Sequence, residues 1–256
     1  TYVPKLTTVA GGGSGDGQDA RIVNLERPHY GAIDPQGRIV FSAYYGHRIY
    51  RIEFDGTLTH LAGSGESTSG PDGPARTTGI YYPAQIAFNA AGELHFAEYS
   101  GNRVRKIVGG TLVTVAGTGT SGATGDNGPA MLATVGAPTG VAFDARGRML
   151  FTQGAGGLVR RVENGIITTV AGTGTTGFSP TATRAREANL LGPGPIFEYP
   201  RGTSGFVFTE SNNVVRSVDG DGGTSILVGG GSQPFDAGIS AQSLSMLSTS
   251  CVAPTA

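Results

Sequence analysis

The chain has 256 residues, 44 of them glycine, and only 14% of its residues are charged. This composition suits many short strands joined by tight turns. A net charge of −1 excludes broad electrostatic attraction to nucleic acid or to an anionic membrane. The single cysteine, Cys251, excludes a disulfide within the chain and a zinc site made of cysteines. No apolar run is long enough for a transmembrane helix, so no membrane span is predicted.

A repeat with a period of 55 residues organises the chain. Its markers are a turn glycine, a proline ahead of the first strand of each unit, and a glycine ahead of the third strand. The markers stand at Gly37, Gly92, Gly147 and Gly202, at Pro28, Pro83, Pro138 and Pro193, and at Gly46, Gly101 and Gly156. Because three independent markers share one period, we interpret the repeat as structural. We expect units at approximately 12–63, 64–117, 118–172 and 173–230, a partial unit at 231–256, and the last strand of a preceding unit at 1–11.

Each unit predicts four strands. In the second unit these are 85–89, 93–97, 103–107 and a fourth strand that ends at Gly117, with turn residues between them. The second strand of each unit carries a phenylalanine that we expect to be buried. These residues are Phe41, Phe96, Phe151 and Phe208. The third strands mix apolar and basic residues, which predicts one solvent-exposed face. The segment before each repeated proline has room for one irregular helical turn.

Four-stranded antiparallel units repeated along a chain predict the blades of a β-propeller. The fold class is therefore all-β, with about four and a half blades. The chain opens on a fourth strand and closes on a first strand at 249–254. Unpaired strands leave open sheet edges, so we expect an excerpt of a longer chain with a larger ring. The open end strands could also pair between molecules.

Several motifs carry a family resemblance. They are GVAFD at 140–144, FAEYSGNRVRKI at 96–107, TTVAG at 168–172 and GDNGPA at 125–130. In these motifs the chain resembles the NHL-repeat β-propeller family, especially its secreted multi-repeat members. The resemblance covers nearly the whole chain and is weakest after residue 178. It implies a ring that commonly has six blades, and functions that range from protein or RNA binding to a few enzymes.

Two glycine-rich stretches, 117–122 and 172–177, match the dinucleotide fingerprint GxGxxG. Dinucleotide binding needs a helix directly after the glycines, and neither stretch is followed by one, so we expect no cofactor. The loop residues Asp16, Asp72 and Asp126 could form Ca²⁺ loops. Each loop offers few carboxylates, so we favour turns in which the aspartate accepts a hydrogen bond from a nearby amide.

The four histidines, His29, His47, His60 and His95, occupy four different positions of the repeat. A zinc site needs several ligands that converge on one point, so this distribution disfavours a shared metal. His29 alone lies at the start of a first strand, where channel-lining residues belong.

Polar residues follow the second strands at Glu98, Gln153 and Glu210. In a propeller these turns surround one mouth of the channel. Resemblance to gluconolactonase-like propellers implies a divalent metal held there, but Ala43 leaves the ring of acids incomplete. The alternative is that the acids cap hairpin turns or pair with Arg103 and its equivalents.

The third strands contain the only concentration of basic residues. They are Arg48, Arg51, Arg103, Arg105, Lys106, Arg160, Arg161 and Arg216. They could form a groove for an anionic partner or RNA. Nucleic acid is disfavoured because the whole chain is nearly neutral and alternation on a half-exposed strand explains these residues.

We therefore expect a non-enzymatic binding or scaffold module in an extracellular or cell-surface protein. Its partner would be another protein or a neighbouring domain of a larger chain. The expected binding face comprises Tyr44, Tyr45, Glu98, Tyr99, Gln153 and Glu210, together with His29. The alternative is a metal-dependent lyase or hydrolase with its site in the channel, using His29 and Glu98 among others.

Overall fold

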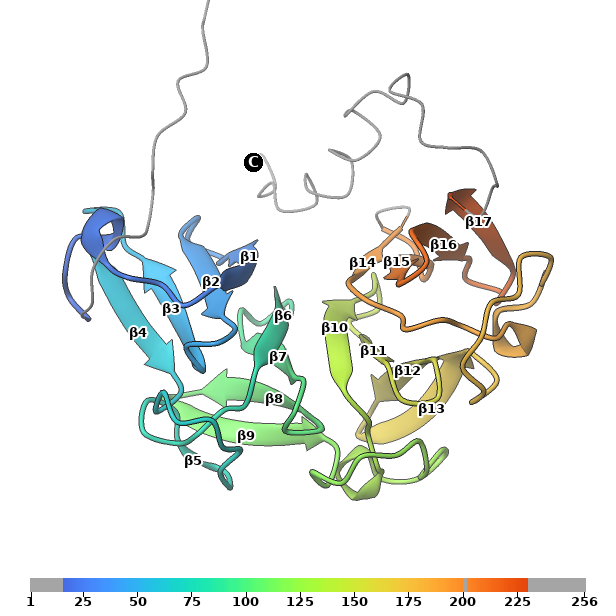
Figure 1. Cartoon of the computed structure of the whole chain (residues 1–256), viewed down its shortest axis with the longest axis horizontal. Coiled ribbons are helices and arrows are strands. Elements are labelled where there is room, and N and C mark those ends of the chain that lie inside the picture. The colour runs from blue at the N-terminus through green and yellow to red at the C-terminus, as the bar shows by residue number, and fades with distance from the viewer. Residues whose placement is uncertain (1–15, 200–201, 230–256) are drawn as a thin grey trace, which may run out of the picture.

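The computed structural model of this chain describes residues 16–199 and 202–229. Four antiparallel sheets lie in an arc around one centre, and the first strand of each sheet lies closest to that centre (Figure 1). Sequential strands are neighbours within each sheet. The fold is therefore the all-β propeller of four-stranded blades that the repeat predicts. The strands expected at 1–11 and 249–254 lie outside the described residues.

The blades have the following bounds. Blade 1 contains β1 (Pro28–Ile33), β2 (Ile39–Ala43), β3 (Arg48–Ile52) and β4 (Leu58–Ala62). Blade 2 contains β6 (Pro83–Phe88), β7 (Leu94–Glu98), β8 (Arg103–Val108) and β9 (Thr111–Ala116), with the short β5 (Gly73–Pro74) on its outer edge. Blade 3 contains β10 (Pro138–Phe143), β11 (Met149–Gln153), β12 (Leu158–Glu163) and β13 (Ile166–Ala171). Blade 4 contains β14 (Ile196–Glu198), β15 (Phe206–Glu210), β16 (Val214–Val218) and β17 (Thr224–Val228). No helix in 16–199 or 202–229 is long and apolar enough to cross a membrane.

In blades 1, 2 and 3 the first strand begins earlier than predicted, at the repeated proline, whereas in blade 4 it begins at Ile196. In blade 2, Pro83 pairs with Glu98 and Ile86 pairs with Phe96, so the register shifts between Pro83 and Ile86. Blades 1 and 3 have the same irregularity. A bulge lets the proline, which has no N–H, join the sheet edge without interrupting the ladder.

The hydrophobic core lies between adjacent blades. Between blades 2 and 3, for example, Val104 and Ala116 of blade 2 pack with Val141 and Phe151 of blade 3. The four predicted phenylalanines are all buried, with exposed fractions of 6%, 0%, 0% and 1% in chain order. Each blade is therefore stabilised by burying its faces against its neighbours.

A recurring alanine bonds to the following blade, and in the three loops between described blades it bonds to the preceding blade as well. The equivalent residues are Ala20, Ala75, Ala130 and Ala185, all at most 1% exposed. The amide of Ala130 donates to Gly165 O at 2.8 Å in blade 3, and its carbonyl accepts from Gly117 N at 3.0 Å at the end of blade 2. Single 3₁₀ turns begin at three of these alanines, in η1 (Ala20–Ile22), η2 (Ala130–Leu132) and η3 (Ala185–Glu187). The pairing also covers part of the outer sheet edge.

A glycine directly after each fourth strand allows this close approach. These glycines are Gly63, Gly117, Gly172 and Gly229, with φ of +95°, +95°, +95° and +85°. A Cβ on Gly117 would lie 2.4 Å from Asn102 O, which is backbone and has no room to move aside. Both the positive φ and the contact therefore require glycine.

We predict that Gly117→Ala destabilises the propeller far more than Gly147→Ala. Both glycines have positive φ, but a Cβ at Gly147 would meet nothing within 4 Å. The unfavourable φ alone costs about 1 kcal/mol, and the backbone clash should raise the loss for Gly117→Ala to about 3 kcal/mol or more. Urea unfolding measures both, and equal losses would contradict the steric account.

Candidate functional site

The third strands are more buried than the predicted solvent-exposed basic face, although the side chains of Arg51 and Lys106 stay partly exposed. Arg105, Arg160 and Arg216, at the same position of blades 2, 3 and 4, are all 0% exposed. In each blade the pairing between third and fourth strands shifts register directly before this residue. The extra residue of this bulge lies in the fourth strand, and the third strand keeps an unbroken register with the second. Arg105 therefore shares a face with Phe96, while Val104 lies on the other face, and both faces are buried because each blade packs between two neighbours.

The buried guanidinium of Arg105 is surrounded by acceptors from two parts of the chain. Its Nη1 donates to Gly70 O at 3.0 Å, and its Nη2 donates to Pro71 O at 2.9 Å and to Asp72 Oδ1 at 3.0 Å. Its Nη1 also lies 3.5 Å from Glu98 Oε2. The side chain thus connects the loop between blades to the end of β7.

The two acids and the amide that we expected on the binding face lie inside the blades instead, where they face the buried arginines. Glu98 and Gln153 are 0% exposed and Glu210 is 4% exposed. Glu210 Oε1 accepts from Arg216 Nε at 2.7 Å, and Gln153 Oε1 accepts from Arg160 Nη1 at 3.3 Å. Pairing with arginine is therefore the correct alternative, although the partner of Glu98 is two residues beyond Arg103. Burial raises the pKa of Glu98, against the opposing charge of its arginine partner.

The loop aspartates do not form the local turns that we favoured. Asp72 accepts from Thr114 N at 2.9 Å, across 42 residues. Asp126 accepts from Thr169 N at 3.1 Å, across 43 residues. Asp16 makes the equivalent bond to His60 N at 2.6 Å. Because Asp72 and Asp126 also pair with buried arginines, their oxygens serve to fasten each loop to the outer strand.

We predict that removing one member of the buried pair is costly. Arg105→Ala would leave Glu98 buried without its cation, a loss of about 3–5 kcal/mol in the free energy of unfolding. The control Lys106→Ala removes a pair with Glu93 whose side chains are 28% and 29% exposed, worth below about 1 kcal/mol. Urea unfolding compares them.

The double variant Glu98→Leu/Arg105→Met should regain part of the loss, because apolar replacement of both ions removes the uncompensated charge. A loss for Arg105→Ala no larger than that for Lys106→Ala would contradict the role of the buried pair.

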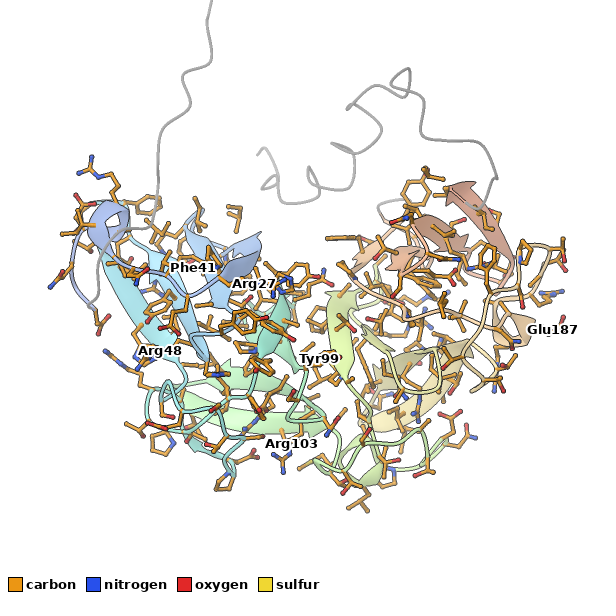
Figure 2. All side chains as sticks on the ribbon, in the orientation of Figure 1. Arg27, Phe41, Arg48, Tyr99, Arg103 and Glu187 are labelled. Carbon is orange, nitrogen blue, oxygen red and sulfur yellow. The ribbon has the colours of Figure 1, made fainter. Side chains whose placement is uncertain are left out.

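Four tyrosines gather at one mouth of the central channel, and we call them with their neighbours the tyrosine cluster. Its members are Arg27, His29, Tyr44, Tyr45, Tyr82 and Tyr99. Tyr44 and Tyr82 stack at 4.7 Å between ring centroids and 8° between planes. The ring centroid of Tyr44 is also 4.9 Å from His29, 5.4 Å from Tyr45 and 6.3 Å from Tyr99. Figure 2 shows the labelled Arg27 and Tyr99 near the inner edges of blades 1 and 2.

A recurring backbone turn positions this cluster. Arg27 and Tyr82, each directly before a repeated proline, have φ of 54° and 56°. Their carbonyls accept from the amides of Tyr44 and Tyr99, both at 3.0 Å. Blades 3 and 4 keep the positive φ but carry small residues, Ala137 and Gly192. The aromatic side chains are therefore particular to blades 1 and 2, and such turns are frequent at functional sites.

The cluster presents neutral rings and one cation. The guanidinium of Arg27 lies 5.0 Å from the ring centroid of Tyr45 and donates from Nη1 to its hydroxyl at 2.8 Å. Tyr45 is 49% exposed and Tyr99 is 37% exposed. Burial, with the neighbouring tyrosines, raises the pKa of Tyr44 to about 12. Burial and then the charge of Arg27 lower the pKa of His29. At neutral pH the rings of Tyr44 and His29 are thus uncharged.

Sequence reasoning located Tyr44, Tyr45, Tyr99 and His29 near one mouth, and the structure brings them into contact. It missed Arg27 and Tyr82. The available signal was that both residues directly precede a repeated proline. The backbone turn at this position places their side chains next to the residues that follow the second strand.

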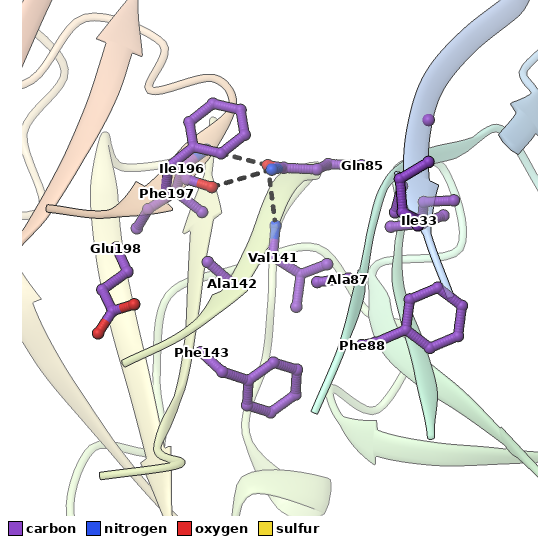
Figure 3. A pocket seen from close by; sticks show the side chains of 13 residues that line it. Ile33, Gln85, Ala87, Phe88, Val141, Ala142, Phe143, Ile196, Phe197 and Glu198 are labelled. Atoms are coloured by element: carbon purple, nitrogen blue, oxygen red, sulfur yellow. Dashed lines mark hydrogen bonds between the residues drawn. The ribbon is translucent and has the colours of Figure 1, made fainter. Parts of the chain in front are cut away.

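The innermost strands enclose a channel cavity of about 230 Å³ (Figure 3). Gln85 extends across it, and its Nε2 donates to Ile196 O at 2.9 Å. Its Oε1 accepts from Ile196 N at 2.9 Å and Val141 N at 3.2 Å. Glu198 is the only ionisable residue among those that line this part of the channel. One carboxylate is too few for a hard cation, which takes several oxygen ligands.

The histidines lie in separate surroundings. His29 and His47 contact tyrosines, His60 Nε2 lies 2.9 Å from Ala62 O, and His95 packs edge-on against Phe143. Within 16–199 and 202–229, no three histidine, cysteine or acidic residues are grouped to hold a metal ion.

No protein-family model and no functionally curated protein sequence matches the chain. Solved structures do. Virginiamycin B lyase from Staphylococcus aureus is 19% identical, with a TM-score of 0.50 over 78% of this chain and 55% of the lyase. An auxiliary nutrient binding protein from Bacteroides ovatus is 13% identical, with a TM-score of 0.59 over 82% of this chain and 49% of its own. A provisionally named gluconolactonase is 13% identical, with a TM-score of 0.54 over 85% of this chain and 68% of its own.

This chain spans about half the length of the lyase and of the nutrient binding protein. At such low identity the likeness extends to the propeller fold and no further, because propellers support unrelated functions.

Proposed function

We propose that this chain is a binding module that recognises a protein partner through the tyrosine cluster. The observation that carries the proposal is a group of contacting tyrosines with an arginine above them, partly open to solvent. Tyrosine and arginine are the residues most enriched where protein interfaces gain their binding energy. Rings already packed together lose little side-chain entropy on binding.

The chemistry of the cluster suits recognition. Its rings offer flat apolar faces, its hydroxyls offer hydrogen bonds, and Arg27 offers a charge for an acidic group on the partner. Because burial lowers the pKa of His29 and raises that of Tyr44 to about 12, these two rings stay uncharged from neutral to mildly basic pH.

We further propose that the module is of the NHL type and belongs to an extracellular or cell-surface protein. The support for this is the motif resemblance in units two and three and the glycine-rich, weakly charged composition. A secreted module would be recovered from the medium or the cell surface in fractionation of the native source.

An enzymatic alternative draws its support from fold-level similarity to a lyase and a gluconolactonase. The two residues expected to form the enzyme's site lie in different places. Glu98 is buried with Arg105, and His29 lies in the tyrosine cluster. Metal analysis after exhaustive dialysis discriminates the two functions. About one divalent ion per chain would favour the enzyme, and a ratio near zero would favour the binding module.

We predict that peptides selected on this protein depend on Tyr45 and Tyr99. A random 12-residue peptide library would be selected on the immobilised protein and the enriched peptides measured in solution. In the variant Tyr45→Ser/Tyr99→Ser their affinity should fall at least tenfold, since loss of aromatic hot-spot residues costs about 2 kcal/mol or more.

Phe54→Ser provides the matched control. Phe54 is 78% exposed and lies in the turn between β3 and β4, at the opposite end of the blade from Tyr45. Peptides that bind both variants as they bind the original protein would contradict the proposal, as would enrichment of peptides that depend on Phe54.

A further inference from the structure

Blade 1 lacks the buried arginine of the other three blades. Tyr50 pairs with Phe41 at the place where Arg105 pairs with Phe96. At the end of the second strand, Ala43 takes the place of Glu98. Both members of the buried pair are thus replaced in one blade, 55 residues before their equivalents.

A pocket of about 400 Å³ lies at this place in blade 1. Its polar wall includes Asp16, Glu26, Arg48, Tyr50 and His60, and Ala43 is part of its lining. In blade 2 the equivalent position of Ala43 carries a glutamate that accepts from the backbone amide of Tyr81 at 2.7 Å. Alanine has no such acceptor. Because its side chain is also smaller than that of glutamate, the change leaves space at this place.

The wall of the pocket suits a cation. Asp72 in blade 2 pairs with the buried Arg105, whereas Asp16 in blade 1 pairs with the outer Arg76, 56% exposed. The rings of Tyr50 and His60 lie 5.5 Å apart at 45°. Burial is the main cause that lowers the pKa of His60, so its ring is neutral at pH 7. Neutral aromatic faces beside carboxylates attract guanidinium groups.

Arg48 is a cation already on the pocket wall, and its charge acts on Tyr50 and His60. Its equivalent, Arg103, lies two residues from Arg105 in blade 2. Arg48 Nη2 donates to Ser64 O at 3.0 Å, and Arg103 Nη2 donates to Thr118 O at 3.3 Å. Both guanidinium groups thus bond to the following loop, and blade 2 holds Arg103 and Arg105 together, whereas in blade 1 Tyr50 stands where the second arginine would be.

We propose that this pocket binds a small molecule with a guanidinium group, which replaces the arginine that the chain supplies in blades 2, 3 and 4. The ligand's guanidinium lies against Tyr50 and His60 and faces the carboxylates of Asp16 and Glu26. This site is separate from the tyrosine cluster and does not depend on the function proposed for it.

Calorimetric titration with n-propylguanidinium, which reproduces the arginine side chain, tests the proposal. Its neutral counterpart n-propylurea controls for shape. We expect saturable binding of n-propylguanidinium with a Kd of about 1 mM or below, and at least tenfold weaker binding of n-propylurea. Equal binding of both probes, or no binding of the guanidinium, would overturn the proposal.

Two variants locate the site. Ala43→Glu/Tyr50→Arg rebuilds the pair found in blade 2 and should weaken binding at least tenfold. Ala43→Leu fills the pocket without adding charge, and should do the same if the double variant does not fold. Phe54→Ser should bind as the original protein does. Unchanged affinity in a folded pocket variant would overturn the assignment.

Discussion

One arginine without solvent contact connects the parts of each blade from the second onward. Taking a guanidinium out of water is costly unless its several N–H groups find acceptors. Arg105 meets most of that requirement with two loop carbonyls and two carboxylates, while its buried Nε has no hydrogen-bond partner among the described residues. The loop from the preceding blade, the end of the second strand and, through Asp72, the outer strand are thereby joined at one side chain. The geometry of the joint between blades depends on this arrangement.

The other recurring features act at the same joint. The buried Ala75, Ala130 and Ala185 of the loops between blades bond to both neighbouring blades, and the glycine after each fourth strand lies tightly against the turn before the third strand of its own blade. In repeat proteins each unit is stabilised mainly by its neighbours, so the joint decides stability more than any single sheet does. Blade 1, which has Tyr50 and Ala43 instead of the pair, leaves a pocket where the others are filled. The repeat thus explains both the shared contacts between blades and the one blade in which the buried pair is replaced.

Most of the fold could be predicted from the sequence because turn chemistry and strand alternation are local properties. The third strands start at the predicted residues, and the repeated phenylalanines are buried. The burial of Arg105 could not be predicted from alternation, because neighbouring blades cover both faces of the third strand. Glu98 was expected at the surface because it follows a strand, and it lies buried beside Arg105 instead. Tyr44 and Tyr99 were found because they follow strand ends, whereas Tyr82 was missed because only its place before the repeated proline, and not its residue type, indicates the backbone turn.

Hydrogen exchange of arginine side chains tests the central claim most directly. In protein labelled with ¹⁵N-arginine, the guanidinium protons of Arg105, Arg160 and Arg216 should exchange slowly at neutral pH, each assigned by its Arg→Lys variant. Arg21, whose side chain is 67% exposed and pairs with Asp19 at the surface, should exchange much faster and serves as the internal reference. Slow exchange at all three guanidinium groups would support the claim that buried arginines connect the parts of each blade. Exchange of all three at the rate of Arg21 would contradict it.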